Sequence, residues 1–163
     1  MARLGDICEI YTGTGFPVEY QGNATGTYPF YKVGDISKNV VAGKLRLCLC
    51  DNYIDDEVAK TLKGTIVPEG TVVFAKIGEA VKLNRRAITS SRCLIDNNIM
   101  GIKPHPGFLD LSFFYHFMCN LKLIEPTIYE IKAYNIRLLE DIIVELKENM
   151  IAPISIETCL SQT

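Results

Sequence analysis

Two short apolar segments, residues 71–77 and 99–102, constrain the fold of this chain more than any other feature. Both are rich in β-branched and aromatic residues, which predicts β-strands, and the first follows a turn at residues 68–70. The chain breaks at Gly78 and returns to strand-like composition at residues 87–89. A helix, then strands, then a helix and a strand, with many glycine turns between them, predict an α+β fold. We expect a twisted mixed sheet, barrel-like, with a few flanking helices.

The loop after the first strand concentrates positive charge. Between Lys76 and Arg92 the chain has five basic residues and one acidic residue, Glu79, a local charge of +4 on a chain whose net charge is −2. The basic residues are Lys76, Lys82, Arg85, Arg86 and Arg92. A cationic loop on an acidic chain is typical of a site for a polyanion such as a phosphate backbone. A solvated hairpin tip explains the same charges, and the loop alone does not choose between the two.

Length and composition fit one compact domain, or one domain with a short appendage. It has 163 residues, of which 48% are hydrophobic, and this excludes a disordered or fibrous chain. No apolar run is long enough to span a membrane, and the first residues lack the hydrophobic region of a signal peptide. We therefore expect a cytoplasmic protein.

The six cysteines do not follow the pattern of a disulfide framework or a zinc site. Disulfide-rich domains are shorter and secreted, and zinc sites combine a C-x₂₋₄-C with a second pair of ligands. Cys48 and Cys50 form a C-x-C on one face of a strand predicted over residues 44–50, and the two histidines, His105 and His116, are isolated. We expect buried reduced thiols and no metal.

Hydrophobic spacing and capping residues predict the remaining elements. A helix is predicted from Leu4 through Tyr11, stopped by Gly13, because apolar residues recur at helical spacing. Asp110 is the expected N-cap of a buried apolar helix over residues 111–123. The other predictions are a strand at residues 28–33 followed by a turn, and a short helix that begins at Asp55 and reaches Leu62.

Catalytic patterns in this sequence are weak. No nucleophile elbow, zinc-protease helix or Cys/His arrangement is present. Glu130 and Lys132 form an E-x-K that, with Asp110 as a second carboxylate, could belong to a metal-dependent nuclease. Three residues with wide gaps arise often by chance, and Asp110 already has a capping role. We therefore expect a chain that binds and does no chemistry, with the nuclease as an alternative.

Several segments follow one another in a recognisable order: residues 4–10 with Thr12-Gly13, residues 28–36, 70–78 and 97–102, then residues 139–144 and 153–157 with Gln162. Together they resemble the target recognition domain of type I restriction–modification specificity (S) subunits. The resemblance implies a domain that reads one half of a split duplex DNA sequence. It also implies partner methyltransferase (M) subunits, which modify adenine with S-adenosylmethionine, and a restriction (R) subunit that joins for cleavage. The chain itself would hold no cofactor.

A full specificity subunit of that family carries two recognition domains joined by long helices, whereas this chain resembles one. We expect a single DNA target recognition domain over residues 1–150, and a tail at residues 151–163 where the conserved spacer helix would begin. The chain is then a half-subunit able to form a homodimer, a truncated product or an excised domain. Residues 124–148 hold six acidic and three basic residues, so this part is expected to face the rest of the protein or a partner subunit.

If the domain binds duplex DNA, phosphate contacts supply most of the affinity and a few side chains in the groove supply specificity. The first candidates are Lys76, Lys82, Asn84, Arg85 and Arg86. Either arginine can bond guanine O6 and N7, and Asn84 can pair with adenine unless it is a turn residue. The second candidates are Thr14, then Lys38 and Asn39 in a loop expected after Ile36, and Tyr134 and Asn135, which with Lys132 could instead be helix surface. A module that docks on a methyltransferase without reading DNA is the remaining alternative.

Overall fold

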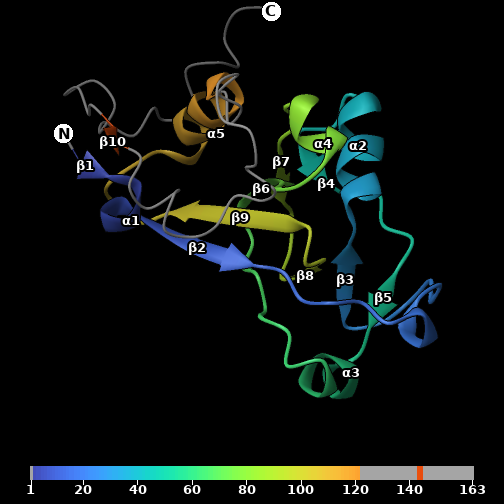
Figure 1. The fold of residues 1–163 in the computed structure, drawn as a ribbon. Helices are drawn as coiled ribbons and strands as arrows, with labels where there is room; N and C mark the ends of the chain where they lie inside the picture. The colour runs from blue at the N-terminus through green and yellow to red at the C-terminus, as the bar shows by residue number, and fades with distance from the viewer. Residues whose placement is uncertain (1, 122–142, 145–163) are drawn as a thin grey trace, which may run out of the picture.

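The computed structural model describes residues 2–121 and 143–144, and its centre is a five-stranded mixed sheet (Figure 1). The strands lie in the order β2 (Cys8–Thr12), β9 (Ile99–Pro104), β6 (Val72–Ala75), β7 (Ala87–Thr89) and β4 (Arg46–Leu47). Neighbouring strands from β2 to β7 are antiparallel, and β4 joins β7 in parallel. The strands predicted at residues 71–77, 87–89 and 99–102 are confirmed as β6, β7 and β9.

Both faces of this sheet are covered, which explains the continuous apolar run of β6. Val72 and Phe74 pack in one cluster with Phe114 and Met118 of α5 (Leu111–Asn120). Val73, between them, packs in a second cluster with the buried Ile36 of α2 (Val33–Val41). Successive side chains of a strand point to opposite faces, so a strand with a helix on each face has no polar position.

A second, three-stranded sheet lies beside the first, in the order β5 (Tyr53–Ile54), β3 (Tyr28–Tyr31) and β8 (Leu94–Ile95). Its small core contains Phe30, Ile54 and Leu94, together with Ala59 of α3 (Asp56–Thr61). The two sheets are connected where Thr14, just after β2, forms a parallel bridge with Asp96, just after β8.

The shorter elements complete the described fold. They are β1 (Ala2–Arg3), α1 (Leu4–Ile7), the 3₁₀-helix η1 (Val18–Tyr20), α4 (Glu79–Lys82) and β10 (Ile143–Val144). β1 pairs antiparallel with β10. In the part of the chain that the structure describes, no helix has the length and apolar character needed to cross a bilayer. The α+β class with mixed sheets is confirmed, and the described strands form open sheets without a closed barrel.

The helix predicted from Leu4 through Tyr11 is wrong after Ile7, where β2 begins. Ile10 packs with the cluster on the α5 face of the sheet and Tyr11 with the cluster on the α2 face, as the period of a strand requires. Backbone pairing with β9 over the whole of β2 supplies hydrogen bonds that the local sequence does not reveal. Tertiary pairing therefore overrides a short helical pattern.

The turn and loop predicted after residue 33 are also wrong, because the chain forms α2 there. Asp35 accepts a hydrogen bond from the backbone N–H of Lys32 at 2.7 Å, which fixes the start of the helix. The strand predicted over residues 44–50 is reduced to Arg46 and Leu47, so Cys48 and Cys50 do not share a strand face.

The helices predicted to begin after Asp55 and Asp110 are confirmed as α3 and α5, and the two aspartates have different hydrogen-bond partners. Asp110 caps α5, accepting from the N–H of Phe113 at 3.0 Å. Asp55 occupies the N-cap position of α3, but its carboxylate accepts from the N–H of Thr27 at 3.3 Å. Among the described residues α5 is amphipathic: Phe114 and Met118 are buried and Ser112, His116 and Asn120 are exposed. We expected this helix to be buried on most sides, and the structure buries one side of it.

The described cysteines are all free thiols, and their surroundings predict different reactivities. Burial raises the pKa of the Cys8 and Cys93 thiols to about 12, and that of Cys50 to about 11. The thiolate is the reactive form, so these side chains are protected twice, by burial and by protonation. Cys48 is exposed.

We expect iodoacetamide at neutral pH to alkylate Cys48 well before Cys8 and Cys93 in the folded protein, with the difference lost in denaturant. Peptide mass mapping over a time course measures the order. Early labelling of Cys93 under native conditions would contradict the described core.

Candidate nucleic-acid interface

The basic loop connects β6 to β7 at one end of the five-stranded sheet. Because the two strands are antiparallel, Lys76 and Arg85 lie at this same end. Gly78 has a φ of +69°, a conformation that L side chains rarely adopt, and it lets the chain turn from β6 into α4. The N–H of Lys76 donates to the carbonyl of Asn98 at 2.9 Å, which fixes the loop beside the turn before β9.

Part of the positive charge predicted for this loop is compensated. Lys82 forms an ion pair with Glu79 at 2.6 Å, and both side chains are largely exposed. Lys76 and Arg85 are half-buried, and neither has an acidic partner within 4 Å among the described residues. Among the described residues, Lys76 and Arg85 are therefore cations of this loop without an acidic partner.

Arg86 points into the protein, so its expected role in reading a base is replaced by a structural one. The residue is 2% exposed, and its guanidinium lies 4.8 Å from the centre of the Phe74 ring. It donates to the backbone carbonyls of Met118 at 3.2 Å and Arg85 at 3.1 Å. These contacts occupy the donors that a guanine would need.

Asn84 works with Arg86 at the end of α5. Its backbone φ is +49°, which asparagine tolerates better than most residues, and its side-chain amide donates to the carbonyl of Cys119 at 2.7 Å. Its side-chain oxygen accepts from Arg86 at 2.8 Å. Asn84 and Arg86 together satisfy carbonyl groups that a helix leaves unpaired at its C-terminus. The alternative of a turn residue describes Asn84 best.

The second candidates are dispersed. Asn39 is fully buried on α2, where its side chain accepts from the N–H groups of Cys48 and Leu49, both at 3.0 Å, so it organises the backbone before β5. Lys38 is exposed but paired with Asp51 at 2.7 Å. Thr14 donates to the carbonyl of Leu62 at 3.3 Å. Tyr134 and Asn135, like Lys132 and Glu130, lie outside the described residues.

The structure adds two features that reasoning from the sequence missed. Asn97 is exposed in the turn before β9, next in sequence to Asn98, whose carbonyl accepts from Lys76, and two adjacent asparagines between strand segments were its available signal. Lys60 and Lys63 line one hollow with Tyr28, and Arg92 lies over the Tyr28 ring, although about thirty residues of chain separate the lysines from the arginine. No local pattern in the sequence indicates that second group.

The nuclease alternative gains nothing from the described residues. Asp110 is engaged as the α5 cap. Within residues 2–121 and 143–144, no three His, Cys, Asp or Glu side chains are placed to hold a metal ion.

Comparisons with known proteins agree with this architecture. A family model for the type I restriction modification DNA specificity domain matches residues 1–147. The HsdS subunit from Thermoanaerobacter tengcongensis matches 86% of this chain with a TM-score of 0.60 and 13% identity. The type I restriction-modification S subunit from M. genitalium matches 86% with a TM-score of 0.54 and 12% identity. A chain solved for complex assembly and conformational transition of the type I R-M system matches 86% with a TM-score of 0.60 and 15% identity.

At these identities the structural likeness concerns the fold. The chain spans about a third of the length of those proteins, between 31% and 32% of each. A search of curated proteins finds no match to this sequence.

Proposed function

This chain belongs to the family of type I restriction modification DNA specificity domains, and we infer that it recognises a specific sequence of double-stranded DNA as part of a specificity subunit. The observation that carries this inference is the family match over residues 1–147, joined to a fold shared with specificity subunits. Since those subunits are about three times as long, this domain would read one part of a longer target.

We assign the contacts to DNA by the burial and pairing of each side chain. Arg85 is the candidate for base contact, because a guanidinium without an acidic partner can bond guanine O6 and N7 together. Lys76 and Lys82 are assigned to phosphates, and Asn97 is added as a polar group at the same end of the sheet. Arg86 and Asn84 are assigned a structural role, because their side chains hydrogen-bond the loop to the C-terminal end of α5.

The partners and the cofactor follow from the proposed role. The domain would direct methyltransferase subunits to adenine, with S-adenosylmethionine bound by those subunits, and a restriction subunit would join the same assembly. This chain would supply recognition and no catalytic group. If this chain acts as a half-subunit, two copies of it would together supply two recognition domains.

The test begins with selection of duplexes from a random-sequence library by the full chain, followed by titration of the enriched sequence. We expect Arg85→Ala to weaken binding of that sequence by about 1–3 kcal/mol and to relax preference at one base pair. The matched control is Arg46→Ala, because Arg46 pairs with Glu69 at 3.5 Å, away from the basic loop.

Equal affinity of Arg85→Ala and the unaltered chain would remove Arg85 from the interface. Failure to enrich any sequence, with salt-insensitive binding to a methyltransferase instead, would favour the alternative of a protein-docking module.

A further inference from the structure

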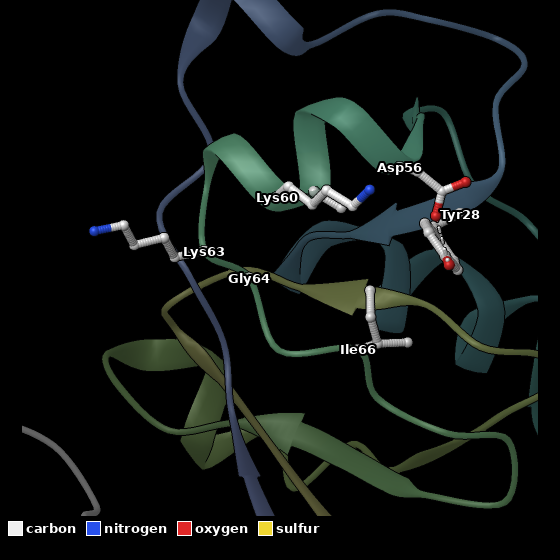
Figure 2. Close-up of a pocket in the computed structure, with 7 residues that line it drawn as sticks. Tyr28, Asp56, Lys60, Lys63, Gly64 and Ile66 are labelled. Atoms are coloured by element: carbon white, nitrogen blue, oxygen red, sulfur yellow. Dashed lines mark hydrogen bonds between the residues drawn. The ribbon is translucent and has the colours of Figure 1, made fainter.

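A second cationic surface lies far from the basic loop, around a hollow of about 270 Å³ between β3 and α3. Figure 2 shows Tyr28, Asp56 and Ile66 around this hollow, with the Lys60 side chain directed toward the Tyr28 side and Lys63 extending the opposite way. Lys60 and Lys63 have no acidic partner within 4 Å among the described residues. The hollow is therefore lined by two lysines that have no ion pair among the described residues, and by one carboxylate, that of Asp56.

Asp56 places one negative charge at the hollow, and its carboxylate accepts a hydrogen bond from another lining residue. The hydroxyl of Tyr28 donates to Asp56 at 2.9 Å, and this bond raises the pKa of Tyr28 above its ordinary value. The guanidinium of Arg92 lies 5.7 Å from the centre of the same ring. Arg92 is thus placed over the tyrosine without an ion pair, and its N–H donors face no acidic residue of the described chain within 4 Å.

Lys63 holds an unusual backbone position. The N–H of Gly64 donates to the carbonyl of Ala59, and that of Lys63 to the carbonyl of Lys60, the two bonds of a Schellman motif at the end of α3. Lys63 occupies the left-handed position of this motif with a φ of +49°, where glycine is the usual residue. Lys63 thus places a cationic side chain at a backbone position where glycine would be less strained.

A role in the helix alone does not account for the group. Lys60 and Lys63 lie at the C-terminal end of α3, where positive charge favours the helix dipole. Arg92 comes from the connection between β7 and β8, outside that helix, yet it lies over the ring of Tyr28, a residue that lines the hollow. Cations from separate elements, spread to both sides of a hollow, fit a linear polyanion better than a single small anion.

We propose that Lys60, Lys63 and Arg92 form a phosphate-contacting surface for the DNA backbone, distinct from the base-reading loop at Arg85. This rests on the proposed function, because the polyanion is the same DNA. Contacts of this kind carry no sequence information, so the surface would raise affinity for every duplex equally. It would also fix the orientation of the domain on the target.

The test compares the full chain with Lys60→Gln/Lys63→Gly on a labelled random-sequence duplex and on the selected duplex, over a range of salt. Each lost phosphate contact lowers the slope of log affinity against log salt by about 1, so we expect a fall of about 2. At physiological salt the affinity should drop roughly ten- to thirty-fold for both duplexes. Arg92→Gln should lower the slope by a further ~1.

The control is Lys103→Gln, which also replaces a lysine by a neutral glutamine. Lys103 lies on β9 opposite Glu9, near the beginning of β2, whereas the connection to the second sheet follows the other end of β2. Its slope and affinity should match those of the unaltered chain. Because glycine relieves the strained position, the thermal midpoint of the double variant should equal or exceed that of the unaltered chain. A lowered midpoint together with weaker binding would indicate a structural role and overturn the proposal.

The remaining outcomes separate this inference from the function on which it rests. Unchanged slopes in the variants, with salt-dependent binding by the unaltered chain, would overturn the phosphate surface and leave DNA recognition standing. A loss confined to the selected duplex would also overturn it, since that is the behaviour of a base contact. No DNA binding by the unaltered chain would overturn both.

Discussion

Gly13→Ala is expected to destabilise the domain by about 3–5 kcal/mol, a large part of the stability of a typical domain. A Cβ at Gly13 would lie 1.9 Å from the carbonyl oxygen of Asp96 and 2.5 Å from that of Ile95. These are backbone atoms at the end of β8, so they cannot turn away as a side chain can. The chain would have to separate there, breaking the 2.9 Å bond from the N–H of Thr14 to Ile95.

The matched control is Gly15→Ala, two residues along the same loop. A Cβ at Gly15 meets no atom within 4 Å. We expect its free energy of unfolding to stay within about 0.5 kcal/mol of the unaltered chain. Urea titrations followed by far-UV circular dichroism measure both variants. Equal stability of the two alanine variants would contradict the close approach of the two sheets at Gly13.

Arg86→Ala is expected to cost about 3 kcal/mol of stability. Removing the buried guanidinium leaves the carbonyls of Met118 and Arg85 without these donors, and hydrogen bonds to charged groups contribute about 1.5–3 kcal/mol each. It also removes the contact with the Phe74 ring. Arg86→Lys should recover part of the loss, because a single ammonium does not reproduce the planar fork of the guanidinium.

The neighbouring substitution Arg85→Ala separates stability from binding. We expect it to change the free energy of unfolding by less than about 0.5 kcal/mol while it weakens DNA binding. Urea titration of both arginine variants gives the comparison. If Arg85→Ala destabilised the domain as much as Arg86→Ala, the described orientation of the two side chains would be wrong.

The two arginines show how far the candidate site could be predicted. Their position in a cationic loop was evident from the sequence, and so was the resemblance of the chain to its family. Which of the two arginines is buried was not evident, because Arg85 and Arg86 have the same chemistry and adjacent positions. The difference arises from the C-terminus of α5, about thirty residues further along the chain, whose carbonyls take the donors of Arg86. The positive charge of the loop can be read from the loop residues alone. Which side chain is buried depends on a helix elsewhere in the chain.

Local patterns in the sequence were enough to predict the elements whose stabilisation is local or whose burial is complete. The β-branched composition of β6, β7 and β9 predicts strands in almost any buried setting, and Asp110 caps α5 through a contact three residues away. Contacts between distant segments set the other elements. Cys8–Thr12 became β2 because β9, about ninety residues later, pairs with it, and Gly13 is required because Asp96 approaches its backbone. Hydrogen bonds and close contacts between distant segments leave no periodic pattern in the sequence, so only the assembled fold reveals them.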